Sequence, residues 1–187
     1  MQAFLVSTGI VALAEMGDKT QLLSLVLAAR FRKPWPIALG ILVATLANHA
    51  LAGAAGTWFT TLLGPQVLRW VLGASFIAMA LWMLIPDKLD EGEGDKAPRL
   101  GVFGTTVVAF FLAEMGDKTQ VATVMLAAQY QALFSVVAGT TLGMMLANAP
   151  VVWFGDAVTR RVPIRIVHLV SALIFCALGA AAIAGWG

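Results

Sequence analysis

The sequence has little charge and almost no cysteine. Charged residues make up 12% of its 187 residues, whereas 60% are hydrophobic. A soluble domain with this composition would leave too much apolar surface in water, so the chain is predicted to be an integral membrane protein. The single cysteine, Cys176, excludes an internal disulfide. No basic stretch precedes the first apolar run, so we expect the N-terminal segment to be retained and not cleaved as a secretion signal.

The apolar residues fall into long runs that predict an all-α fold with six transmembrane helices. A bilayer needs about 20 apolar residues per helical span, with every backbone polar group satisfied inside the helix. The runs cover residues 3–29, 35–59, 66–86, 101–128, 131–155 and 163–186. The lipid bilayer is therefore the main predicted partner.

Lysine and arginine are distributed unevenly among the predicted loops, which gives an expected orientation. Three loops on one side hold Arg30, Arg32 and Lys33; Lys88, Lys96 and Arg99; and Arg160, Arg161 and Arg165. The opposite side has only Arg69. The positive-inside rule makes the basic loops, including the central one, cytoplasmic and places both termini outside the cell (inner) membrane. Because the net charge of +2 comes from these short clusters, we expect no nucleic-acid partner.

One charged heptad occurs twice, each time inside an apolar run. Residues Glu15–Gln21 and Glu114–Gln120 have the same sequence, EMGDKTQ, and each follows Leu-Ala. Each heptad begins about a dozen residues into its run, near the expected middle of the bilayer at ~1.5 Å per residue. An ionisable group there costs about 2.5 to 3.5 kcal/mol and marks a ligand site or a pathway. Identical repetition of these groups therefore indicates a function and not a packing role.

The two halves of the chain are copies of each other. Glu15 aligns with Glu114, and Leu46-Ala47-Asn48 matches Leu146-Ala147-Asn148 after one extra residue. Each copy has three predicted helices, an odd number, so the second copy must cross the membrane in the opposite sense. We expect two inverted three-helix repeats, residues 1–86 and 101–187, joined by an acidic cytoplasmic linker, residues 87–100. The linker is either a solvated connector or a vestibule that attracts cations.

The two heptads are expected to form one acidic site between the repeats. On a continuous helix the Glu, Asp and Lys of each heptad would share one face. Inverted symmetry would then bring four carboxylates together with two ammonium groups, with a formal charge of about −2. Oxygen ligands of this kind favour hard cations such as Mg²⁺, Ca²⁺ and Mn²⁺ over zinc or copper. The candidate carboxylates are Glu15, Asp18, Glu114 and Asp117.

Small residues inside the apolar runs have two predicted roles. Gly17 and Gly116 loosen the helix at each heptad and free backbone carbonyls, as in the broken helices of transporters. Other small residues would let the second helix of each half approach its neighbours closely, although they also reflect the alanine-rich composition. These residues are Gly40 with Ala44 and Gly139 with Gly143.

Polar side chains near the heptads are candidate supporting residues. The amides can be ligands or can form hydrogen bonds between helices; they are Gln21, Gln120, Asn48 and Asn148. The hydroxyls can bond to carbonyls of their own helix and need no further role; they are Thr20, Thr119, Ser24 and Thr123.

The remaining polar groups, Lys19, Lys118 and His49, leave alternatives open. Each lysine can pair with the glutamate one turn back, hold the aspartate beside it, or form a structural ion pair. His49 has no counterpart, because Ala149 fills the equivalent position. It is either a proton relay or a polar residue bonded within the bundle.

The paired heptads resemble those of a known transporter family. Two copies of Glu-x-Gly-Asp-Lys-Thr in a six-helix chain are similar to the cation/proton exchangers that include the Golgi manganese and calcium transporter of eukaryotes, chloroplast manganese transporters and small bacterial manganese exporters of the MneA type. The resemblance covers nearly the whole chain, and neither heptad departs from the family pattern. It implies cation ligands at Glu15, Asp18, Glu114 and Asp117, with Lys19, Thr20, Lys118 and Thr119 as supporting residues.

The resemblance implies a secondary transporter, not an enzyme, that exports Mn²⁺ from the cytoplasm in exchange for protons and needs no resident cofactor. Ca²⁺ is the other candidate substrate, and the sequence does not decide whether one chain or a homodimer is the working unit. The alternatives are an intramembrane acid-dependent hydrolase, a divalent-cation channel and a helical assembly factor. Against the hydrolase, the sequence offers no nucleophile–base pair.

Overall fold

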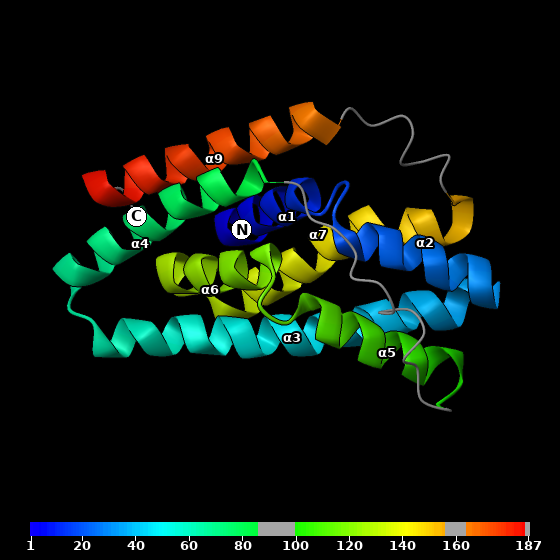
Figure 1. Ribbon diagram of the computed structural model, residues 1–187. Coiled ribbons are helices and arrows are strands. Elements are labelled where there is room, and N and C mark those ends of the chain that lie inside the picture. Colours follow the sequence, from blue (N-terminus) through cyan, green and yellow to red (C-terminus); the bar gives the residue numbers. More distant parts are fainter. Residues whose placement is uncertain (86–99, 156–163, 186–187) are drawn as a thin grey trace.

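The computed structural model describes residues 1–85, 100–155 and 164–185. These residues form helices and contain no strand, which confirms the predicted all-helical fold (Figure 1). The helices are α1 (Gln2–Ala14), α2 (Lys19–Phe31), α3 (Pro34–Leu62), α4 (Pro65–Met83), α5 (Gly101–Glu114), α6 (Lys118–Tyr130), α7 (Leu133–Phe154) and α9 (Ile164–Ala184). Most of the predicted linker, residues 87–100, lies outside the described residues.

Four of these helices are long and apolar enough to cross a membrane, namely α3, α4, α7 and α9. Two shorter apolar helices, α1 and α5, end where the heptads begin. Many large hydrophobic side chains on the long helices are exposed, for example Leu39, Leu81 and Leu173. An exposed apolar surface of this extent is favourable against lipid and unfavourable in water, so the fold is that of a multi-pass membrane protein.

The predicted continuous helices 3–29 and 101–128 are each broken in two. α1 and α2 are separated at Gly17, whose φ is +83°, and α5 and α6 are separated at Gly116, whose φ is +76°. Asp18 and Asp117 then adopt extended backbone as the N-caps of α2 and α6. The prediction that Glu, Asp and Lys of a heptad share one helical face is therefore wrong, because the helix ends between them. The loosening predicted at the two glycines is a complete break.

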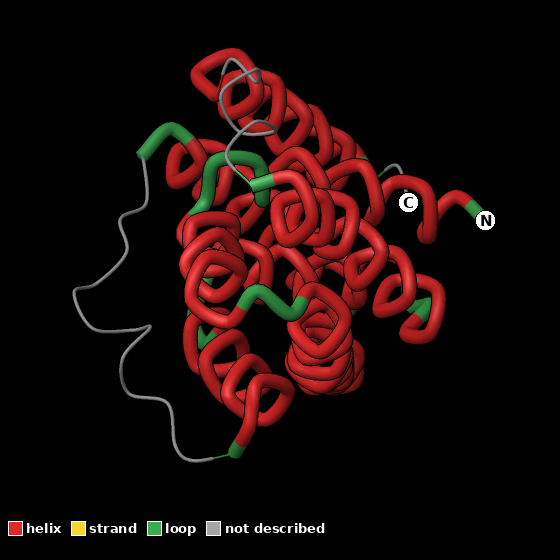
Figure 2. Tube along the Cα trace, turned by 90° about the vertical axis from the view of Figure 1, so that its right-hand side faces the viewer, coloured by secondary structure: helices red, strands yellow, loops and turns green. Residues whose placement is uncertain are grey.

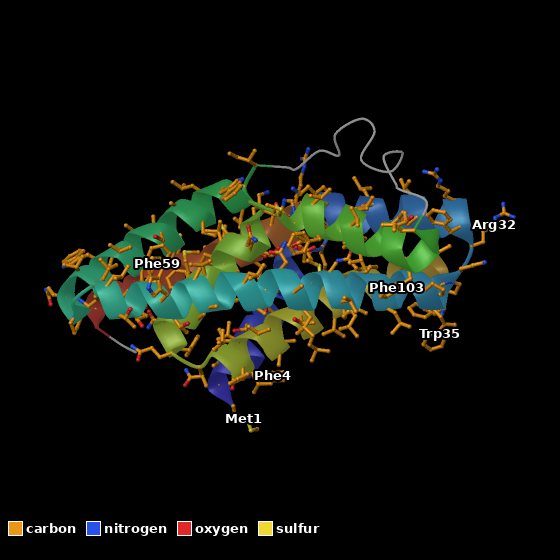
Figure 3. The ribbon with its side chains drawn as sticks, turned by 90° about the horizontal axis from the view of Figure 1, so that it is seen from below. Met1, Phe4, Arg32, Trp35, Phe59 and Phe103 are labelled. Atoms are coloured by element: carbon orange, nitrogen blue, oxygen red, sulfur yellow. The ribbon has the colours of Figure 1, made fainter. Side chains whose placement is uncertain are left out.

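The broken helices run in opposite directions through one bundle. In Figure 1, α1 and α2 lead toward the turn between α2 and α3, whereas α5 and α6 lead away from that end. At this end Trp35 and Trp153 make an edge contact with ring centroids 5.3 Å apart, and Figure 3 shows Arg32, Trp35 and Phe103 together there. The view along the helices in Figure 2 shows them packed side by side as a single body.

Glycines hold the short apolar helices close to the long ones. A Cβ added to Gly139 of α7 would lie 2.5 Å from the carbonyl oxygen of Phe4 in α1, and one on Gly143 would lie 2.6 Å from that of Thr8. In the other half, a Cβ on Gly40 of α3 would lie 2.6 Å from Thr106 of α5. The predicted close approach of these helices is confirmed, since no side chain fits between them.

The packing of α1 on α7 makes a prediction about two glycines of this helix pair. Gly139→Ala should destabilise the fold by about 1–3 kcal/mol, because its methyl group would press on the backbone of α1. Gly9→Ala is the control: nothing lies within 4 Å of its Cβ position, so alanine should leave stability unchanged or raise it. Thermal unfolding of the purified variants in detergent measures both. Equal shifts for the two variants would contradict the close α1–α7 contact.

The helix breaks predict a graded response to alanine at three glycines with positive φ. Gly116 and Gly101 both have open space at the Cβ position, so alanine at either should cost only the left-handed backbone strain, about 1–2 kcal/mol. Alanine at Gly17 should cost more, because its Cβ would also lie 2.8 Å from Ile164. Unfolding measurements on the three variants would refute this account if Gly17→Ala were the mildest of them.

Candidate metal centre

Each helix break is held together by the glutamine at the end of its heptad. The backbone amide of Gly17 donates to Oε1 of Gln21 at 2.9 Å, and that of Gly116 donates to Oε1 of Gln120 at 2.6 Å. These bonds satisfy amides that the helix ladder no longer uses. The glutamines were predicted to be ligands or to form hydrogen bonds between helices. Each of them also accepts a hydrogen bond from the glycine amide at its helix break.

Glu15 and Glu114 lie at the ends of α1 and α5, and both are 0% exposed. Oε2 of Glu114 accepts a hydrogen bond from Thr119 at 2.9 Å, and Oε2 of Glu15 accepts one from Thr20. Thr20 and Thr119 therefore donate hydrogen bonds to the carboxylates, whereas the sequence also allowed them to bond only to carbonyls of their own helices. The other carboxylate oxygen, Oε1, has no hydrogen-bond partner in either glutamate.

Three carboxylates from the two halves come together at the breaks. Glu15, Glu114 and Asp117 each offer one oxygen, and these oxygens lie within 4.8 Å of one another. All three residues are buried. Ionised oxygens this close repel one another in an apolar bundle, so a bound cation or added protons stabilise the cluster. Asp18 is equally buried, at 3% exposure, but is not part of this group of three.

Each lysine of the heptads contacts another element of the bundle. Nζ of Lys19 lies 3.6 Å from Oδ1 of Asp117, so this lysine joins the two halves. Nζ of Lys118 donates to the carbonyl oxygen of Ile85 at 2.7 Å, beyond the end of α4. The sequence left open a partner within the heptad or a structural ion pair. Both of these contacts join a lysine to another element, and the contact with Asp117 is an ion pair.

Asparagines on α3 and α7 contact residues of the two heptads. Nδ2 of Asn148 lies 3.4 Å from Oε2 of Glu15, and its Oδ1 accepts from Ser24 at 2.9 Å. Oδ1 of Asn48 accepts from Gln120, and its Nδ2 donates to the carbonyl of Phe111 at 3.3 Å. Gln21 likewise donates to the carbonyl of Ala147 at 3.0 Å. These are the hydrogen bonds between helices that the sequence offered as one alternative.

The two halves differ at two further buried residues. His49 is 0% exposed, both ring nitrogens lack a hydrogen-bond partner, and Nε2 lies 4.0 Å from Oε2 of Glu114. In the other half Nδ2 of Asn148 lies 2.9 Å from Sδ of Met144. Sequence reasoning did not select Met144, although its place four residues before Asn148 puts both on one helical face.

Comparison with known proteins identifies the family. A family model described as the divalent cation/proton antiporter GDT1 matches residues 3–91 and 102–186. The "Putative manganese exporter" of Vibrio cholerae is 53% identical over 176 residues, which cover 94% of this chain and 87% of that protein.

More distant relatives match over a similar extent. A GDT1-like protein of Synechocystis is 27% identical over 194 residues, covering 94% of this chain and 93% of the relative. The GDT1-like protein 5 of Arabidopsis thaliana is 26% identical over 217 residues, covering 96% and 94%. No solved structure matches the chain at a significant level. The chain therefore belongs to the GDT1 family of divalent cation/proton antiporters and is a transporter, not an enzyme.

Proposed function

We propose that this protein exports Mn²⁺ from the cytoplasm in exchange for protons. The observation that carries the proposal is the convergence of Glu15, Glu114 and Asp117 at two helix breaks, with their oxygens within 4.8 Å of one another. Asp18 occupies the equivalent position to Asp117 and completes the proposed set of four carboxylates. Both halves of the site come from one chain, so the proposal needs no second copy.

The proposed membrane architecture has six crossings. α1 with α2 and α5 with α6 would each form one broken span, while α3, α4, α7 and α9 are each long enough to cross alone. Residues 1–86 and 101–187 would then be inverted repeats joined by the linker 87–100. The opposite directions of the two broken helices and the matched glycine contacts of Gly40 and Gly139 support this arrangement.

The proposed orientation follows from charge. Arg30, Arg32 and Lys33 lie at the end of the bundle where α2 meets α3, and Arg69 lies at the opposite end, at the start of α4. The positive-inside rule then makes the first end cytoplasmic, together with the central linker, and leaves both termini outside.

The nature of the donor atoms supports a hard divalent cation as the substrate. Carboxylate and amide oxygens suit Mn²⁺ and Ca²⁺, and His49 is the only nitrogen donor of the imidazole type near the described cluster. The name of the Vibrio cholerae relative supports manganese. We therefore propose Mn²⁺ as the main substrate, with Ca²⁺ as the competing ion to be compared.

Proton coupling is proposed to follow from competition for the same oxygens. When the metal leaves, the buried carboxylates repel one another, and protonation of two of the four would neutralise the site. Thr20 and Thr119 hold one oxygen of each glutamate, so the other oxygen remains available to an ion or a proton. Lys19 would partly neutralise Asp117 in the empty site. With the site neutral, one repeat would move back relative to the other, and no separate proton channel would be needed.

Neutralising one glutamate should abolish transport. Glu15→Gln and Glu114→Gln each remove a buried carboxylate of the cluster but keep its shape, so Mn²⁺ uptake into inverted vesicles with an acidic interior should fall to background. Glu91→Gln, which removes the same charge in the linker, is the matched control and should transport normally. Undiminished uptake by Glu15→Gln would refute the assignment of the site.

The same vesicles separate an exchanger from a channel. An exchanger should move Mn²⁺ inward against its gradient while the interior becomes less acidic, and collapsing the proton gradient should stop uptake. A channel would let Mn²⁺ equilibrate at the same rate with or without the proton gradient. That second result would favour a divalent-cation channel over an exchanger.

Mn²⁺ binding should strengthen as pH rises. Because the ion displaces protons from carboxylates, the affinity of the purified protein should rise up to about 100-fold per pH unit if two protons leave, wherever the empty site is protonated. Calorimetry in buffers of different ionisation enthalpy counts the protons released. Binding that is independent of pH and releases no protons would exclude direct competition.

A further inference from the structure

A cavity of about 330 Å³ opens at the end of the bundle where α6 and α9 finish and α4 begins. Its polar lining comes from Gln66 and Arg69 of α4, and from Gln129 and Gln131 at the end of α6. Arg69 is the one basic residue that the sequence places opposite the three basic clusters. The proposed transport mechanism gives this arginine no role.

The guanidinium of Arg69 lacks a carboxylate partner within the described part of the chain. Its Nε is buried without a hydrogen-bond partner, and its Cζ lies 5.8 Å from the ring centroid of Trp70. A Cβ added to Gly185 would lie 3.1 Å from a guanidinium nitrogen, so the end of α9 forms a wall beside the group. Arg69 as a whole is partly exposed, but its buried Nε–H donor lacks a partner, which is unfavourable, and an anionic ligand would satisfy it.

The start of α4 adds a second feature that favours an anion. The helix begins after Gly64 with Pro65 in its first turn, and no side chain caps it. The backbone amides of Gln66 and Val67 therefore have no acceptor within the helix, and the positive end of the helix dipole faces the same region as Arg69. Together these groups resemble the phosphate sites found at helix N-termini.

A second cavity, of about 360 Å³, lies next to the first and has an apolar lining. It lies between α3, α4 and α6 and is lined by apolar side chains such as Phe59, Val71 and Met125. Figure 3 shows Phe59 far along α3, away from the end that holds Arg32 and Trp35. The two cavities share the lining residues Leu68, Leu72 and Ala128. A cavity with a cationic side chain thus lies beside an apolar cavity.

We propose that the two cavities form one binding site for an anionic phospholipid. Arg69 and the start of α4 would hold the headgroup phosphate, since a guanidinium fork matches phosphate oxygens. Part of one acyl chain would lie in the apolar cavity, which α4 lines from Leu68 to Ser75, about 10 Å at ~1.5 Å per residue. A free phosphate ion would use only the first cavity and a sterol only the second, whereas a phospholipid uses both.

The test is a binding titration of the delipidated full chain in detergent, read by native mass spectrometry. Phosphatidylglycerol, phosphatidylcholine and inorganic phosphate are the three probes. Arg69→Gln should weaken phosphatidylglycerol binding about tenfold or more, the loss expected for one charge-assisted contact. Arg165→Gln, which removes the same charge near the start of α9, is the control and should bind as the unmodified chain does.

A second variant tests the apolar cavity without changing the charge. Ser75→Phe should fill the apolar cavity and weaken phosphatidylglycerol binding while Arg69 stays in place. Equal affinities for Arg69→Gln and Arg165→Gln would overturn the proposal. It would also be overturned if inorganic phosphate bound through Arg69 while Ser75→Phe left phosphatidylglycerol binding unchanged, because the site would then be one for a free anion. A preference for phosphatidylcholine would contradict the role given to the charge of Arg69.

Discussion

The constraint on which the structure depends is the presence of buried carboxylates in a bundle that is otherwise apolar. Glu15 and Glu114 have no exposure, and Asp18 and Asp117 have almost none. An intact helix would place such side chains where only other side chains can satisfy them. Breaking the helix exposes backbone groups at the same depth. Each heptad contains the residues that its break needs: a glycine that adopts positive φ, a threonine that donates to the glutamate, and a glutamine that accepts from the freed glycine amide.

The two breaks are built alike but have different surroundings. Asn148 contacts Glu15, whereas His49 is the neighbour of Glu114. A transporter that alternates between two faces needs two states of similar energy but not of identical structure. These differences give the two halves separate environments, and in the proposed exchanger they would distinguish the inner from the outer state.

Long apolar runs predicted α3, α4, α7 and α9 to within a few residues, since the length of an apolar segment is a local property. The same runs predicted one continuous helix where α1 and α2, and α5 and α6, are separate. The repeated heptad indicated the carboxylates. The breaks were only partly predicted, because the sequence does not show which glycines adopt a positive φ. Other glycines, such as Gly40 of α3 and Gly139 of α7, instead allow close packing between helices. The partners of Lys19, Lys118 and Gln120 depend on how the halves meet, and no pattern within one half contains that information.

The bond between Lys118 and the carbonyl of Ile85 has a consequence for how movement can spread. Lys118 is the first residue of α6, directly after the aspartate of the second break, while Ile85 follows the last turn of α4. α6 extends from there to the cavity beside Arg69. A shift of α6 along its axis would therefore lengthen or break the hydrogen bond of Lys118 at one end of the helix and change the shape of the cavity at the other end. α6 is thus one continuous helix that connects the break beside the acidic cluster to the opposite end of the bundle.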